Sequence, residues 1–97
     1  MDIIHLQRTA HANARDKGFW EGEPSAEALA AKLALVHSEV SEALECLRDG
    51  SAWSSELADI VIRVADLAEA TGVDLGVAIA NKMAFNATRP HKHGKLI

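Results

Sequence analysis

Four acidic residues in this sequence have the chemical type and the spacing to form a reactive or metal-binding site. Glu39 and Glu42 lie three residues apart, and Glu56 and Asp59 repeat that spacing further along the chain. Helix residues three apart project from neighbouring parts of one face, so each pair would present two carboxylates together. Carboxylate oxygens are hard ligands that suit Mg²⁺, with Mn²⁺ as a substitute. The acids predict a divalent metal site if two helices bring the pairs together.

Two long segments with helical periodicity must position these acids. The first should begin near Ser25 and end at 48–50, and its apolar residues recur at helical spacing: Leu29, Leu33, Val36, Val40, Ala43, Leu44 and Leu47. The second should be capped by Ser54 or Ser55 and end before Gly72, with its own apolar seam: Leu57, Ile60, Val61, Val64, Leu67, Ala68 and Thr71. Packing of the two seams would form a helical hairpin.

The short connection at 49–54 sets the height of each acid pair in that hairpin. At about 1.5 Å per residue, Glu42 lies roughly 9 Å before Arg48, and Asp59 lies roughly 7 to 8 Å beyond Ser54. The two pairs can therefore meet, and their mutual repulsion would raise their pKa values unless a cation lay between them. The alternative is ordinary solvated helix acids. A di-iron carboxylate bundle needs Glu-x-x-His pairs, and none occurs.

Two further helices are predicted on either side of the hairpin. One covers about 3–17, and the other starts after Asp74 and stops before Pro90, because proline disfavours helical geometry in the residue before it. Residues 91–97 are expected to form an extended tail. No stretch alternates in the manner of a strand. The sequence predicts an all-α fold, a four-helix bundle-like domain that spans 1–97.

The size and composition of the chain favour assembly with further copies. Ninety-seven residues are near the limit at which one core stabilises a domain by itself. Small residues are abundant on the predicted seams, and they bury little side-chain area per contact: Ala30, Ala34, Ala43, Ala58, Ala65 and Ala68. We therefore expect oligomerisation to complete the domain.

The charge distribution and the single cysteine limit the possible binding partners and the cellular compartment. The net charge is −4, and residues 81–97 carry four Lys or Arg and no acid, so the rest of the chain carries −8. This balance argues against nucleic-acid binding but would suit a small polyanion where the two regions meet. The start lacks signal-peptide character, and no run approaches a membrane span. Cys46, expected to be a small buried hydrophobe, allows no internal disulfide, which fits a cytoplasmic protein.

The last predicted helix carries a set of polar residues that suit phosphate. Lys82, Asn86 and Arg89 recur at helical spacing on one face, and Lys92 follows in the tail. These donors could bind the phosphate charge that the metal leaves unneutralised. The alternative is a solvated basic helix end, which the macrodipole favours.

Aromatic residues in predicted loops are candidates for contact with a nucleobase. Trp20 and Trp53 could stack on a base or could merely cover one end of the helices. His11 and Asn13 could face the same pocket from the first helix.

Two charged residues continue the acidic stripe of the third helix. Arg63 and Asp66 follow Glu56 and Asp59 at helical spacing, and an internal ion pair or a subunit contact explains them.

The order of these motifs resembles a known family. Two acid pairs separated by thirteen residues are followed by DLAEATGVDLGVAIANKMAFNATRPHKHGK, and KGFW precedes them at 17–20. This arrangement resembles the MazG-like nucleoside triphosphate pyrophosphohydrolases, an all-α superfamily that also contains the dimeric dUTPases and phosphoribosyl-ATP pyrophosphohydrolase. The similarity extends to HGK at 93–95 and so covers most of the chain.

The resemblance implies an enzyme that hydrolyses acid anhydrides. It would cleave (deoxy)nucleoside triphosphates between the α and β phosphates with Mg²⁺, release a nucleoside monophosphate and pyrophosphate, and clear unwanted nucleotides. The metal ligands it implies are Glu39, Glu42, Glu56 and Asp59, with Glu39 also orienting or deprotonating the attacking water. The KGFW segment resembles the wall of the base pocket, which favours Trp20 over Trp53 as the stacking residue.

The resemblance also implies a homodimer or homotetramer, with the tetramer favoured, in which helices from two chains build each site. Two other functions stay open. One is phosphoribosyl-ATP hydrolysis, which keeps the mechanism and changes the substrate. The other is a non-catalytic helical module for dimerisation or regulation, in which the acids only keep the surface soluble.

Overall fold

The computed structural model describes residues 1–97 and is entirely helical, which confirms the all-α prediction. Its elements are α1 (Ile3–Asp16), α2 (Ala26–Asp49), α3 (Ser54–Ala70), α4 (Leu75–Ala87) and the short 3₁₀ helix η1 (His91–Gly94). The expected extended tail is wrong at η1, where Lys92 and His93 both have a φ of 53° and turn the chain back on itself. The turn is closed by a hydrogen bond from the His93 amide to the Pro90 carbonyl.

Local side-chain contacts explain where most helices begin. The side chains of Asp2, Ser25 and Asp74 each accept a hydrogen bond from the backbone amide three residues later, which caps α1, α2 and α4. The predicted serine cap of α3 is wrong. Its N-cap is Trp53, which has no side-chain capping bond and instead accepts the Glu56 and Leu57 amides on its backbone carbonyl. The third helix therefore starts at Ser54 itself.

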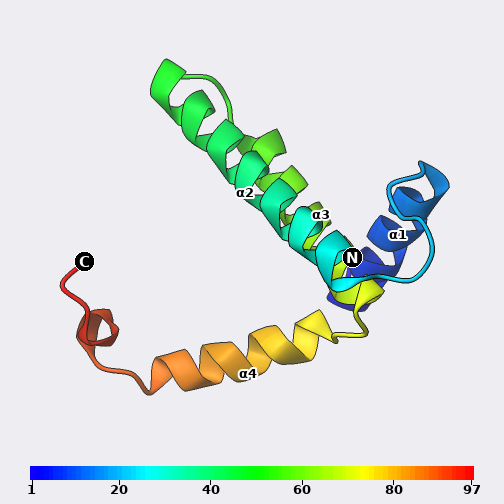
Figure 1. Ribbon diagram of the computed structural model, residues 1–97. Helices are drawn as coiled ribbons and strands as arrows, with labels where there is room; N and C mark the ends of the chain where they lie inside the picture. Colours follow the sequence, from blue (N-terminus) through cyan, green and yellow to red (C-terminus); the bar gives the residue numbers. More distant parts are fainter.

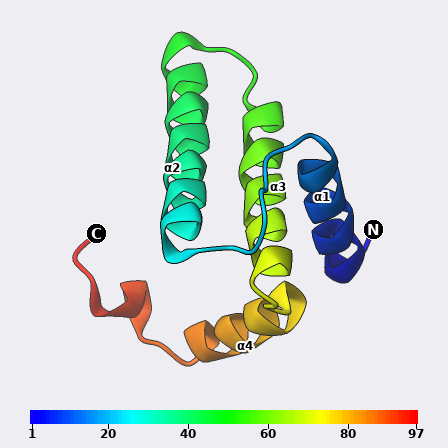
Figure 2. The same ribbon diagram turned by 45° about the vertical axis from the view of Figure 1, so that its right-hand side comes forward.

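Helices α2 and α3 form the predicted antiparallel hairpin, and α1 packs on the other side of α3 (Figure 2). Helix α4 leaves the end of α3 and projects away from the hairpin (Figure 1). It is held near its start, where the Leu75 amide donates to Gln7 Oε1 of α1 at 2.8 Å. The four helices do not close into a bundle within one chain.

The core of the single chain is small and consists mostly of alanine. Seven residues are buried: Gln7, Ala10, Trp20, Glu39, Ala43, Ala65 and Ala68. Gln7 is the largest side chain that is fully buried, and its amide nitrogen donates to Glu69 Oε1 at 3.2 Å and to the Val73 carbonyl at 2.9 Å. A satisfied glutamine thus fastens α1 to the connection between α3 and α4.

Half of the residues in the predicted apolar seams of α2 and α3 stay exposed. Large apolar side chains face solvent along α2, α3 and α4: Leu33, Val40, Leu44, Leu47, Leu57, Val61, Val77 and Met83. The accessible surface of the chain is 7090 Å². A folded monomer of its mass, 10.4 kDa, would expose about 5400 Å². None of the helices combines the length and the apolar content that crossing a bilayer would need.

Candidate metal centre and adjoining cavity

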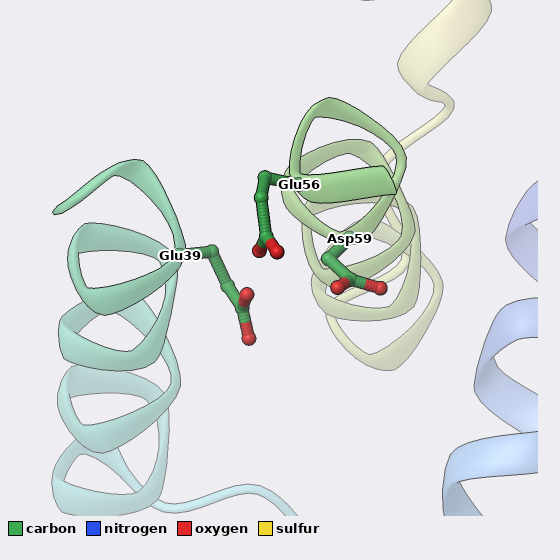
Figure 3. Close-up of side chains that lie close together, drawn as sticks. All are labelled: Glu39, Glu56 and Asp59. Carbon is green, nitrogen blue, oxygen red and sulfur yellow. The ribbon is translucent and has the colours of Figure 1, made fainter. Parts of the chain in front are cut away.

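The hairpin brings three of the four predicted acids together. Glu39 reaches from α2 toward α3, where Glu56 extends into the space between the two helices and Asp59 lies beside it (Figure 3). One carboxylate oxygen of each residue lies within 4.8 Å of those of the other two. The heights estimated from the helical rise compared Glu42 with Asp59, whereas the structure groups Glu39, one turn earlier on α2, with Glu56 and Asp59. Three oxygens this close can be shared by one hard divalent cation.

Glu42 lies beside this cluster, outside the three-residue group. It is exposed, one turn beyond Glu39 on α2. The negative charge of Glu39, reinforced by that of Glu56, raises the pKa of the Glu42 carboxyl above its usual value. Such repulsion disappears when a cation binds between the acids, so the raised pKa is compatible with a role for Glu42 at the edge of a metal site.

The burial of Glu39 makes a cation chemically fitting at the cluster. Only 8% of Glu39 is exposed, and its Oε1 accepts a hydrogen bond from Arg63 Nε at 2.8 Å. Its Oε2 is buried and has no hydrogen-bond partner, and the same is true of Glu56 Oε2. A buried carboxylate oxygen without a partner costs free energy, and two of them in one acidic cluster would both be satisfied by a bound cation. Oxygen ligands of this kind match Mg²⁺ and Mn²⁺.

A cavity of about 380 Å³ adjoins the acidic cluster. Its acidic lining residues are Glu39, Asp59 and Asp66, and its other lining residues include Asn13, Lys17, Phe19, Lys32 and Arg63. Its volume falls within the range of small-molecule sites, which is about 300 to 1000 Å³. A polar molecule could therefore contact carboxylates, cations and an aromatic ring at once.

Trp20 is buried behind this cavity instead of lining it. Its indole Nε1 donates to both carboxylate oxygens of Asp66, at 2.9 and 3.0 Å. Lys32 Nζ lies 4.6 Å from the ring centroid, and the His11 ring packs against the indole in a T-shaped contact with 5.5 Å between the two centroids. Because its face and edge are already covered, Trp20 anchors the loop after α1 and offers no free surface for stacking. This contact geometry does not support its predicted role as a platform for the base.

Phe19 is the aromatic residue that borders the cavity. It is 60% exposed and lies next to Trp20 in the chain. The KGFW segment contains both rings, and its sequence has no periodicity from which their directions could be read. Phe19, instead of the predicted Trp20, is therefore the ring of this segment that borders the cavity.

His11 takes part in the contacts that hold Trp20. Its Nδ1 lies 2.7 Å from Asp66 Oδ1, and its Nε2 accepts a hydrogen bond from Arg15 Nε at 2.9 Å. Since Nε2 is the acceptor, Nδ1 carries the proton and donates it to Asp66. Of the two α1 residues expected near the base, Asn13 borders the cavity and His11 supports the loop behind it.

Trp53 lies at the connection between α2 and α3, at the tip of the hairpin. It is the N-cap of α3, 43% exposed, and absent from the cavity lining. The structure therefore does not bring Trp53 together with the other predicted base-binding residues.

Replacement of Trp20 by Phe tests its role as an anchor. Trp20→Phe removes the indole donor from a largely buried carboxylate, so the free energy of unfolding should fall by about 1 to 3 kcal/mol. Urea unfolding followed by far-ultraviolet circular dichroism measures this change. The matched control is Trp53→Phe, which should stay within about 0.5 kcal/mol of the wild type because Trp53 Nε1 makes no hydrogen bond. Equal losses in the two variants would contradict the assignment.

The residues predicted to bind phosphate lie apart from the acids within one chain. Lys82, Asn86 and Arg89 belong to α4 or follow it, and α4 projects away from the hairpin (Figure 1). Lys82 and Arg89 both approach the Phe85 ring, at 4.8 and 5.6 Å from its centroid. Arg89 and Lys92 border a second hollow of about 560 Å³. Within one chain they are therefore not brought to the acids.

The sequence predicts an ion pair for Arg63 but does not identify its partner. Arg63 forms the expected internal ion pair, but its partner is Glu39 across the hairpin, whereas Asp66 binds Trp20 and His11. The helical spacing of Arg63 from Asp59 was the available signal, since it places Arg63 on the same stripe as the acids.

Cys46 is half-buried rather than fully buried as expected. Removal from water, followed by the charge of Glu56, raises the pKa of its thiol. It therefore stays a neutral thiol at the edge of the acidic cluster.

The site thus combines a cluster of carboxylate oxygens with a cavity that is lined by both negatively and positively charged side chains. An arrangement of this kind suits a polar, anionic molecule that binds together with a divalent cation. Comparison of the chain with protein-family models, with curated proteins and with solved structures gave no match.

Proposed function

We propose that this protein is a nucleoside triphosphate pyrophosphohydrolase that requires Mg²⁺. The observation that carries the proposal is the pair of buried, unpartnered oxygens on Glu39 and Glu56, which converge with Asp59 at the border of a cavity. A solvated patch of acids would leave no such oxygens without a partner. The motif order that resembles the MazG-like enzymes points to the triphosphate as the substrate.

The acids would hold the metal and the cavity would hold the substrate. Glu39, Glu56 and Asp59 are the proposed ligands, and Glu42 completes the set at the exposed edge. Bound Mg²⁺ would neutralise phosphate charge and lower the pKa of a coordinated water. Phe19 and Asn13 would contact the nucleoside, since both border the cavity.

Proton transfer from the attacking water needs a carboxylate that is free to accept it. Glu39 was the candidate, but its Oε1 accepts from Arg63 and its Oε2 is the proposed metal ligand. Glu42 is exposed and lies beside these ligands, so one of its oxygens can accept the proton, which makes it the better base. In the proposed reaction, a water oxygen bonds to the α phosphorus, the bond from that phosphorus to the bridging oxygen breaks, pyrophosphate leaves, and Glu42 takes the proton.

A second copy of the chain is part of the proposal. The chain exposes 7090 Å², which exceeds the surface of a typical monomer of this mass by about 1700 Å². Two chains that buried such an excess would form an interface of about 3400 Å², within the range of obligate dimers. The exposed seams of α2 and α3 supply the apolar surface. A homodimer satisfies this requirement, and a homotetramer would pair two such dimers.

The second copy would also bring the cations of α4 to the acids. In its own chain α4 extends away from the hairpin and exposes Val77 and Met83 (Figure 1). The Asn86 Oδ1 atom is buried without a hydrogen-bond partner. We propose that α4 packs against the hairpin of the partner subunit, so that Lys82, Asn86 and Arg89 face the distal phosphates of the substrate held there.

Product analysis tests the proposed function. Purified protein is incubated with Mg²⁺ and a panel of canonical and modified nucleoside triphosphates, together with phosphoribosyl-ATP, and pyrophosphate is distinguished from phosphate by a coupled assay. We expect pyrophosphate and the monophosphate in equal amounts from at least one substrate. Release of phosphate alone, or activity that persists in excess chelator, would contradict the proposal.

A further inference from the structure

Arg63 is a cation inside the candidate site that the predicted set of phosphate-binding residues does not include. Its side chain is one-third exposed, and it borders the cavity together with Glu39 and Asp59. Its one hydrogen bond to the protein runs from Nε to Glu39 Oε1 at 2.8 Å. The two Nη groups, with four N–H donors between them, make no hydrogen bond to the protein.

The other cations of the cavity are less suited to contact a ligand beside the acids. Lys32 Nζ donates to the Phe19 carbonyl at 2.5 Å and lies over the Trp20 ring. Lys17 is the C-cap of α1 and is exposed. Arg63 lies one turn beyond Asp59 on α3 and is joined to Glu39, so it is the cation next to the proposed metal ligands.

The contact with Glu39 fixes the direction of the guanidinium group. An arginine that is held through Nε keeps its Nη donors in one plane, and such a fork matches the oxygens of a phosphate. A triphosphate that approaches the acids would meet repulsion from any carboxylate charge that the metal leaves unbalanced. A fixed cation at the same edge offsets that repulsion and favours one orientation of the phosphate nearest the metal.

We propose that Arg63 is a phosphate-binding residue of this site, held by Glu39 through Nε and donating from its Nη groups to a phosphate group of the substrate. The inference rests on the proposed function. It adds Arg63, from the chain that holds the metal ligands, to the phosphate-binding cations expected from α4 of the partner subunit. It assigns the phosphate next to the metal ligands to Arg63, and it leaves the distal phosphates to Lys82 and Arg89.

Ligand binding by Arg63 variants of the full chain tests this assignment. Inorganic tripolyphosphate serves as the probe, because it carries the phosphates without a base, and its binding in the presence of Mg²⁺ is measured by isothermal titration calorimetry. Arg63→Gln should weaken its binding about 10- to 100-fold, and Arg63→Lys, which keeps the charge and loses the fork, should weaken it less. Arg48→Gln is the matched control, since Arg48 also pairs with a glutamate but is exposed at the far end of α2, and it should bind like the wild type.

Binding of Mn²⁺ separates a phosphate contact from a purely structural role. Electron paramagnetic resonance titration should show that Arg63→Gln binds Mn²⁺ at least as tightly as the wild type, because a positive charge beside Glu39 is removed. Parallel loss of Mn²⁺ and tripolyphosphate binding would overturn the assignment, as would tripolyphosphate binding within threefold of the wild type. If the wild type binds neither probe, the proposed function fails as well. If the wild type binds both and the variants are unchanged, only the role of Arg63 fails.

Discussion

Substitution of Asp59 by Asn should abolish high-affinity Mn²⁺ binding and lower the rate of pyrophosphate release by about a thousandfold, equivalent to ~4 kcal/mol of transition-state stabilisation. Asp59 supplies one of the three oxygens that lie within 4.8 Å of one another, and an amide oxygen carries no charge to replace it. Asp59 is exposed, so the substitution should leave the helices and their stability unchanged. Steady-state kinetics and Mn²⁺ titration by electron paramagnetic resonance measure the two effects.

The matched control for Asp59 is another exposed acid of the same hairpin. Glu45 lies on α2, 65% of its side chain is exposed, and it pairs with Arg48 near the end of the helix. Glu45→Gln should bind Mn²⁺ and turn over substrate like the wild type. If the protein is a non-catalytic helical module, Asp59→Asn and Glu45→Gln should be equally harmless. Retention of activity in Asp59→Asn would therefore eliminate the proposed metal centre.

Substitution of Leu44 by Asp should disrupt the assembly and with it the fold. Leu44 belongs to the apolar seam of α2 and is 54% exposed in a single chain. A charge placed in an apolar interface loses its hydration, and symmetry repeats this cost in both subunits of a dimer. The wild type should elute at two or four times its 10.4 kDa mass, and the variant should lose most of its helical signal at micromolar concentration. Light scattering after size exclusion and circular dichroism report the two properties.

The control for the Leu44 substitution is a leucine that lies outside the apolar seams of the helices. Leu96 lies in the C-terminal tail and is 90% exposed. Leu96→Asp should keep both the mass and the helical signal of the wild type. A wild-type protein that is monomeric and unfolds cooperatively would contradict the proposed assembly, because a chain with so small a core would then be stable alone.

Local rules predicted the helices well and the heights of the acids to within about one helical turn. Ser25 and Asp74 cap their helices through short-range side-chain contacts that depend on no other part of the fold. The rise per residue and the short connection at the tip place Glu42 near the height of Asp59, whereas the structure groups Glu39, one turn earlier on α2, with Asp59. These features are determined by residues a few positions apart.

Contacts between elements could not be read in the same way. Trp20 and Phe19 are adjacent in a loop, and only the packing of that loop against Asp66 decides which ring is buried. Arg63 has acids within reach on its own helix, yet its partner is Glu39 on the next one. Helical periodicity tells which residues share a face, whereas the rotation of one helix against another decides which of them meet.

The sequence by itself determined an all-helical chain, a hairpin that carries acids on both of its helices, and a core poor in large side chains. Only the tertiary structure decided that Glu39 is buried with an unpartnered oxygen, that Phe19 borders the cavity, and that α4 projects from the hairpin. The physical reason is the range of the forces involved. Capping, helical rise and turn closure act over a few residues, whereas burial and hydrogen-bond pairing depend on surfaces that meet only after the helices have packed.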